Sequence, residues 1–118
     1  MHNSSQEGGK EITVSGLRFL GEQDGPPERL VKHRLTDLFS MDPNILRAYF
    51  ARVTFVGTDE VSVALGLRTQ SGPDTEIVKT VGIVFGSVFN AREHLDIVFL
   101  SDGQEAELKK VCKPFFKR

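Results

Sequence analysis

Hydrophobic and polar residues alternate cleanly along residues 61–69, the second of two neighbouring segments, 47–55 and 61–69, that have the character of β-strands. In the second segment the apolar side chains that share one face are Val61, Val63, Leu65 and Leu67. Strict alternation is typical of a β-strand with one buried face. Gly57 and Asp59, which lie between the two segments, belong to the residue types that favour a tight turn. The pattern therefore predicts a β-hairpin.

A helical pattern precedes this hairpin, over residues 27–40. The apolar residues that recur at helical spacing are Val31, Leu35, Leu38 and Phe39. Pro27 suits the first turn of a helix, because the N–H that proline lacks has no partner there. Pro43 favours an end to the helix, because the residue before a proline avoids the helical conformation.

The N-terminal part of the chain gives weaker signals. Residues 1–10 are polar and glycine-rich, and we expect a disordered segment because so little apolar surface cannot offset the entropy of ordering. Residues 11–15 alternate apolar and polar positions, which predicts a short strand. Residues 21–27 combine glycine, proline and charged residues, which predicts a loop. The ordered domain is thus expected to span residues 11–118.

Residues 77–89 fit two different structures. Their β-branched residues favour a strand by propensity, yet the apolar positions also recur with a helical period. We favour a helix over residues 75–90, because the run is long for one strand and Asp74 is a good N-cap. On that helix Gly82 and Gly86 would lie one turn apart. There they would allow close packing on the small side chains of the second hairpin strand.

The chain closes with a further strand and a further helix. Residues 94–100 alternate apolar and polar positions, and Ser101 and Asp102 favour the start of a helix that Pro114 ends. The predicted order is β-α-β-β-α-β-α. It indicates a two-layer α+β domain, in which helices pack over a mainly antiparallel or mixed sheet.

Length and charge narrow the class of protein. A chain of 118 residues is expected to form one domain. Its 15 basic and 16 acidic residues leave no strong global field, so we expect neither a nucleic-acid partner nor a membrane surface. The single cysteine, Cys112, fits a reducing compartment, and the N-terminus carries no secretion signal. We therefore expect a cytoplasmic protein.

Four short motifs follow one another in a defined order. They are Leu20 to Glu22 with Pro27 and Leu30, Ile45 to Ala51, Leu95 to Ile97, and Pro114 to Arg118. Together they resemble the C-terminal domain family of the enhanced serine sensitivity protein SseB, over residues 11–118. The family usually ends in Pro-Phe-Tyr and basic residues, so Phe116 here lacks the tyrosine hydroxyl.

The resemblance implies an α+β fold and a link to serine sensitivity, and it implies no established chemistry. Many members of the family also carry an N-terminal SseB-type domain, for which a chain of 118 residues has no room. A role that requires both domains is therefore not expected of these 118 residues by themselves.

The search for reactive groups predicts no catalytic, cofactor-binding or metal-binding residues. Cys112 lies among apolar residues and reads as a buried structural thiol. His94 and Asp96 can project from one face of a strand, where a hydrogen-bonded pair is more plausible than a catalytic dyad. The histidines lack the spacing of metal ligands, and the glycines lack the sequence context of a nucleotide site.

The candidate interaction surface consists of Tyr49, Phe116, Lys117 and Arg118. Tyr49 and its neighbour Phe50 point to opposite sides of a strand, so one faces the core and the other can face a partner. Phe115 is expected to close the core. Phe116 either packs there too or turns outward as a partner anchor, with Lys117 and Arg118 on a polar rim.

Three functions are consistent with these residues. The leading hypothesis is a non-catalytic interaction or regulatory domain that binds another protein, with homo-oligomerisation as one form of that binding. A regulator that binds a small molecule is the second. An enzyme whose site includes His94 and Asp96 is the third. A flat apolar patch would favour the first, and a hollow with converging polar groups would favour the other two.

Overall fold

The structure is a computed structural model of the chain, and it describes residues 11–12, 16–58, 60–89 and 95–118. Its sheet contains six strands, which are β1 (Glu11–Ile12), β2 (Leu17–Glu22), β3 (Ile45–Phe55), β4 (Val61–Thr69), β5 (Asp96–Phe99) and β6 (Phe116–Lys117). Its helices are α1 (Pro26–Ser40), α2 (Thr75–Val88) and α3 (Asp102–Lys109). The predicted α+β fold is confirmed.

The β3–β4 hairpin forms the centre of the sheet. The strand order is β1-β5-β4-β3-β2, and β6 pairs with β3. β3 and β4 are antiparallel, with Phe50 opposite Leu65, whereas β4 and β5 are parallel, so the sheet is mixed. Gly57, in the turn of the hairpin, has a φ of 95°, which a residue with a Cβ rarely adopts. The predicted hairpin is therefore confirmed.

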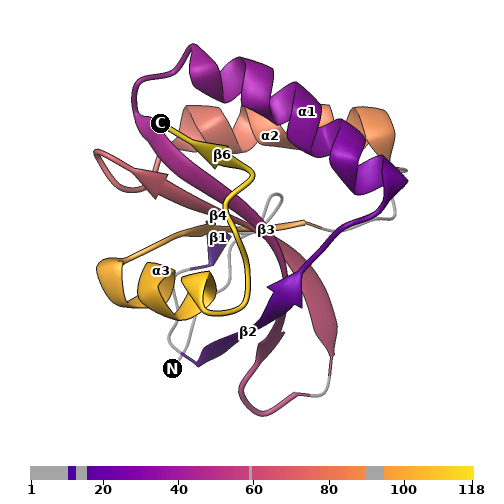
Figure 1. Cartoon of the computed structure of the whole chain (residues 1–118), viewed down its shortest axis with the longest axis vertical. Coiled ribbons are helices and arrows are strands. Elements are labelled where there is room, and N and C mark those ends of the chain that lie inside the picture. The colour runs from indigo at the N-terminus through magenta and orange to yellow at the C-terminus, as the bar shows by residue number, and fades with distance from the viewer. Residues whose placement is uncertain (1–10, 13–15, 59, 90–94) are drawn as a thin grey trace.

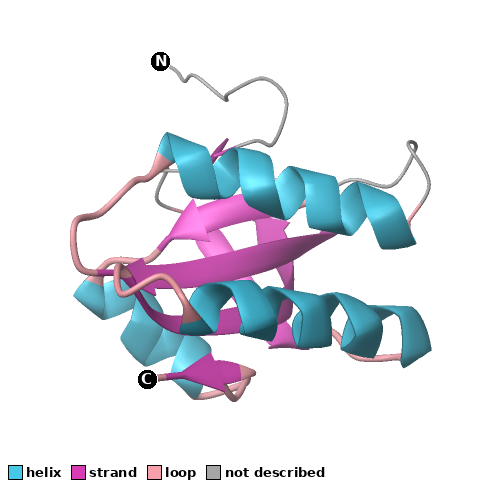
Figure 2. Ribbon diagram, turned by 90° about the horizontal axis from the view of Figure 1, so that it is seen from above, coloured by secondary structure: helices cyan, strands magenta, loops and turns pink. Residues whose placement is uncertain are grey.

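Two helices of 15 and 14 residues cover one face of the sheet. Figures 1 and 2 show α1 and α2 side by side above the strands. The buried residues of α1 are Val31, Leu35 and Phe39, and those of α2 are Ile77, Val81 and Phe85. The Asp74 side chain accepts hydrogen bonds from the N–H groups of Glu76 and Ile77 at the start of α2. The helical interpretation of this ambiguous segment is confirmed, because its apolar stripe meets the sheet.

The short helix α3 packs on the opposite face of the sheet (Figure 1). A Cβ placed on Gly66 of β4 would lie 3.2 Å from side-chain atoms of both Leu100 and Leu108, so glycine permits this close approach. The predicted packing role of Gly82 and Gly86 is wrong, since a Cβ at either position would meet no atom within 4 Å. The small face of β4 receives α3, while α2 contacts the sheet through large side chains.

The N-terminal elements differ in part from the prediction. The strand that leads into α1 is β2, at residues 17–22, because Leu17 and Phe19 pair with Phe55 and Val53 of β3. The predicted loop at 21–27 therefore begins with two strand residues, and α1 starts at Pro26. Of the strand predicted at 11–15, only Glu11 and Ile12 are described, and they pair with β5 in parallel. Residues 13–15 and the segment 1–10 lie outside the described residues.

The C-terminal segment closes the free edge of β3. β6 pairs with Arg47 and Ala48, whereas β2 pairs with residues 51–55 along the same edge. Between them, the N–H of Gln23 donates to the carbonyl of Phe50 at 2.9 Å. Two segments from opposite ends of the chain thus cover one edge, and protect it from pairing with another chain.

Candidate functional site

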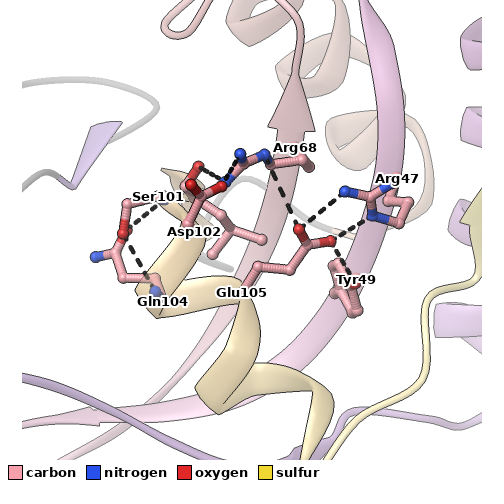
Figure 3. Close-up of polar contacts among 8 residues, drawn as sticks. Arg47, Tyr49, Arg68, Ser101, Asp102, Gln104 and Glu105 are labelled. Atoms are coloured by element: carbon pink, nitrogen blue, oxygen red, sulfur yellow. Dashed lines mark hydrogen bonds and ion pairs between the residues drawn. The ribbon is translucent and has the colours of Figure 1, made fainter.

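A buried carboxylate joins α3 to the hairpin. Glu105 is only 5% exposed, and its carboxylate lies between the guanidinium groups of Arg47 and Arg68 (Figure 3). The Tyr49 side chain lies beneath it and is fully buried. We call these four residues the Glu105 cluster.

The contacts within the Glu105 cluster are short. Arg47 donates two hydrogen bonds, from Nε to Oε2 of Glu105 at 2.5 Å and from Nη2 to Oε1 at 3.0 Å. The Tyr49 hydroxyl donates to Oε2 at 2.6 Å. Nε of Arg68 lies 3.9 Å from Oε1, and this guanidinium also forms an ion pair with Asp102. The two-pronged Arg47 contact gives both strength and a fixed orientation.

The register of the hairpin explains why a carboxylate is needed here. Arg47 and Arg68 stand directly opposite each other on β3 and β4, and like charges in that position repel. The start of α3 is fixed by Ser101 and Gln104, which exchange side-chain and backbone hydrogen bonds in a capping box (Figure 3). This cap places Glu105, one turn into the helix, over the two arginines.

The contacts within the cluster favour an ionised Glu105 and a neutral Tyr49. Hydrogen bonds from Arg47 and then Tyr49 lower the pKa of Glu105 to about 2, against the opposing effect of burial. Burial and the hydrogen bond to Glu105 raise the pKa of Tyr49 above its usual value. A general acid or base works best with a pKa near the working pH. The shifts move the pKa of Glu105 down and the pKa of Tyr49 up, so both move away from neutral pH. The cluster therefore acts as an ionic link between α3 and the hairpin.

Two of the residues expected on an interaction surface lie in the interior. Tyr49 is 0% exposed and Phe116 is 8% exposed, so neither ring is available to a partner in this fold. Helices cover both faces of the sheet, so a residue on either face is shielded. Tyr49 lies on the face that α3 covers. Phe116 packs edge-on against Phe39 with ring centroids 5.8 Å apart, and Phe115 also contacts Phe39. Both terminal phenylalanines therefore close the core.

The two basic residues of that expected surface differ in their contacts. Lys117 is exposed. Arg118 donates to three backbone carbonyls, those of Phe39 at 2.6 Å, Asp42 at 2.9 Å and Ile45 at 3.0 Å. Its guanidinium thus satisfies carbonyls at the C-terminal end of α1, where helices leave such groups unpaired. Of the four expected residues, Lys117 is the one whose side chain is exposed and has no hydrogen bond or ion pair with the residues that the structure describes.

The candidate reactive groups are placed as follows. Cys112 is buried, and burial raises the pKa of its thiol to about 11, with a further contribution from Glu22. The thiol donates to the carbonyl of Phe50 at 3.6 Å, as a structural cysteine does. Asp96 is buried in β5, and its expected partner His94 lies outside the described residues. Among the residues that the structure describes, no cluster of histidine, cysteine and acidic side chains could hold a metal ion.

An apolar groove runs between β2 and α3. It comprises two adjoining hollows of about 410 and 240 Å³ that share Leu17, Phe19 and Glu107. Val56 and Val111, which are 69% and 42% exposed, line the smaller hollow. Its charged rim consists of Arg18, Glu107 and Lys110. We call this surface the β2–α3 groove.

A second kind of hollow, of about 340 Å³, lies where β4 and β5 end. Arg68, Ser101 and Asp102 contribute its polar groups. These groups already have partners, because Arg68 binds Asp102 and the Ser101 hydroxyl accepts from the N–H of Gln104. The hollow therefore offers few free polar groups to a small ligand.

The fold and the site define a small α+β domain whose sheet carries helices on both faces and an ionic link beneath the shortest helix. The model of the SseB protein C-terminal domain family matches residues 18–118. The chain belongs to this family, as its motifs indicated. No curated protein and no solved structure matches the chain. In the described part of the chain, no helix combines the length and apolar character needed to cross a bilayer.

Proposed function

We propose that this domain is a non-catalytic interaction domain that binds another protein through the β2–α3 groove. The observation that carries the proposal is the exposure of apolar side chains along this groove, above all Val56 and Val111. Apolar surface rimmed by polar residues is typical of protein interaction sites. The proposal includes a regulatory role in the cytoplasm, and the single cysteine, which is buried and unpaired, is consistent with a reducing compartment.

The groove stays open because α3 is short. Its eight residues cover the middle of the sheet, where Leu108 and Cys112 are buried. Leu17 and Phe19, on the edge strand β2, remain half-buried beside it. A partner segment that filled the groove would remove these apolar groups from water, at about 25 cal/mol for each Å² buried. An effect on serine sensitivity would then pass through a protein contact.

The experiment is affinity capture from the source cell with quantitative mass spectrometry, comparing three tagged forms of the domain. They are the wild type, the double variant Val56→Glu/Val111→Glu, and the control Ile83→Glu. Ile83 is 75% exposed on α2, away from the groove, so its substitution tests for a general effect of adding charge. Circular dichroism and thermal melting confirm that all three forms are folded.

We expect specific proteins to be retained by the wild type and by Ile83→Glu, and to be lost from the double variant. Recovery of an untagged second copy of the chain would identify the partner as the protein itself. Equal retention by all three forms, or no specific retention by the wild type, would contradict the proposal.

A further inference from the structure

β2 is an edge strand of the sheet. It stands at one end of the strand order, beside the hairpin, and β3 is its one strand partner in the described part of the chain (Figure 1). An edge strand presents backbone N–H and C=O groups that can pair with another chain.

The register of β2 identifies which of these groups point outward. The N–H of Val56 donates to the carbonyl of Gly16 at 2.7 Å, so Gly16 belongs to a hydrogen-bonded pair with β3. Such pairs alternate along antiparallel strands, and Leu17 and Phe19 fall at the positions between them. The backbone groups of Leu17 and Phe19 therefore point away from β3. No hydrogen bond joins these outward groups to another residue that the structure describes.

The first half of β2 suits the addition of a strand better than the second half. The register with β3 is regular from Leu17 to Phe19 and shifts between Phe19 and Gly21. A bulge of this kind bends a strand and hinders pairing along its edge. An added strand would therefore pair with residues 17–19.

The β2–α3 groove reaches this edge. Successive side chains of a strand point to opposite faces of a sheet. Leu17 and Phe19 lie on the face that α3 covers, whereas Arg18 lies on the other face. All three nevertheless line the smaller hollow. The hollow thus extends along the edge of β2 itself, where an added strand would lie.

The charges beside the edge favour an acidic residue in such a strand. Arg18 and Arg52 lie on the face away from α3, and both are exposed. Neither forms an ion pair with a residue that the structure describes. Residues opposite each other on neighbouring strands share a face, so an acidic residue opposite Arg18 would form a favourable cross-strand pair.

We propose that the β2–α3 groove binds an extended segment of a partner protein, which adds to the sheet as a strand on the edge of β2. The proposal rests on the protein-binding function above and specifies the occupant of the groove. Apolar residues of the segment lie opposite Leu17 and Phe19 and fill the hollow, and an acidic residue between them faces Arg18. In strand addition the backbone hydrogen bonds supply affinity and the side-chain pockets supply specificity.

The same edge disfavours a second copy of the chain as the added strand. A symmetric antiparallel pair that used all the outward groups would join Leu17 of each copy to Phe19 of the other. Arg18 would then stand opposite its own counterpart, and like charges in that position repel.

The test measures binding of a fluorescent, end-capped peptide, Ser-Thr-Val-Glu-Val-Thr-Ser, by fluorescence anisotropy. One control peptide carries N-methyl groups on both valines, whose N–H groups would donate to Leu17 and Phe19. The other carries an N-methyl group on the glutamate, whose N–H would point away from β2. Amide hydrogen exchange, followed by NMR, reports pairing at Leu17 and Phe19 directly.

The protein variants form matched pairs. Leu17→Pro removes the outward N–H, which β3 does not use, whereas Leu17→Ala loses the leucine side chain and keeps this N–H. Arg18→Glu is tested with the peptide and with a form that has lysine in place of glutamate. Lys79→Glu, at an exposed position on α2, is the control for net charge. Thermal melting confirms that each variant is folded.

We expect the peptide to bind the wild type and Lys79→Glu alike, and to slow exchange of the Leu17 and Phe19 amides about tenfold or more. Methylation of the valines should weaken binding about tenfold or more, and methylation of the glutamate less than about twofold, because only the valines pair with β2. Leu17→Pro should bind more weakly than Leu17→Ala, and Arg18→Glu should select the lysine peptide.

Absence of peptide binding, unchanged exchange at Leu17 and Phe19, or equal binding of the two methylated peptides would overturn the proposal. A wild-type dimer that the peptide dissociates would overturn it in favour of a second copy. Adding Leu17→Pro and Leu17→Ala to the affinity capture separates the proposal from the protein-binding function. Proteins that both variants retain equally, but that Val56→Glu/Val111→Glu loses, would show that the groove binds without strand addition.

Discussion

The Tyr49 hydroxyl donates a hydrogen bond of 2.6 Å to Oε2 of Glu105, 56 residues further along the chain. This bond lies beneath α3, where both side chains are shielded from water. It joins the central strand to a helix of only eight residues. A helix that short has little stability of its own, so contacts of this kind hold it in place.

Replacing Tyr49 with phenylalanine should lower the free energy of unfolding by about 1.5–3 kcal/mol, because a buried carboxylate loses one of its donors. Urea denaturation of wild type and variant measures this difference. The double-mutant cycle with Glu105→Gln isolates the energy of the pair. A change below about 0.5 kcal/mol would mean that the bond contributes nothing.

The pH dependence of stability should report the ionisation of Glu105. Its pKa is lowered from 4.5 to about 2, so in acid the unfolded chain takes up a proton before the folded protein does. The stabilisation is thus complete above about pH 4.5 and is lost as the pH falls toward 2, with a total of about 3 kcal/mol. Denaturation of the wild type and Glu105→Gln should show a difference that narrows over this range. A difference independent of pH would contradict the assignment.

The helices and the hairpin could be predicted because short-range patterns determine them. Val31, Leu35 and Phe39 recur with the period of a helix, and α1 buries all three. In α2, strand propensity favoured the wrong structure, and the combination of Asp74 with the spacing of Ile77 and Val81 decided correctly. The helical spacing of apolar residues therefore outweighs the strand propensity of β-branched residues here, because that spacing lets α2 bury its apolar side against the sheet.

The Glu105 cluster could not be predicted in the same way. Arg47 and Arg68 read as polar positions on half-buried strands, and Glu105 as a residue that suits the start of a helix. The register around the hairpin turn would have placed the two arginines opposite each other, which signals a need for a carboxylate. Which carboxylate supplies it depends on how α3 crosses the sheet, and that is a tertiary property.

Arg118 should matter for stability and Lys117 should not. Arg118→Ala removes three hydrogen bonds to carbonyls, two at the end of α1 and one at the start of β3, and should cost about 1–3 kcal/mol. Lys117→Ala changes an exposed side chain and should stay within about 0.5 kcal/mol. Thermal melting of the two neighbouring variants makes the comparison. Equal losses would show that the Arg118 contacts are not formed in solution.

The two terminal phenylalanines should both stabilise the fold, to different degrees. Phe116 is 8% exposed and its replacement by alanine should cost about 3–5 kcal/mol, whereas half-buried Phe115 should cost less. Chemical denaturation ranks the two, and sedimentation shows whether either change alters association. A stable Phe116→Ala variant with weakened association would restore the anchor role that the structure does not support.

Cys112 should react slowly with a thiol reagent in the native protein. Its pKa is raised to about 11, and its thiol is buried, so little thiolate is present or accessible at neutral pH. Labelling followed by mass spectrometry should speed up sharply once urea unfolds the domain. Rapid labelling without denaturant would show that the end of α3 opens in the native state.

The divided edge of β3 has a consequence for the order of folding. The bond between the Arg118 guanidinium and the Ile45 carbonyl spans 73 residues, and β6 pairs with the same end of β3. Closing so long a loop is slow compared with forming the hairpin. During folding, one end of the central strand therefore stays open to other chains until the last segment docks. Shortening the C-terminal segment would prolong this exposed state and make the domain prone to aggregate at concentrations that the unshortened domain tolerates.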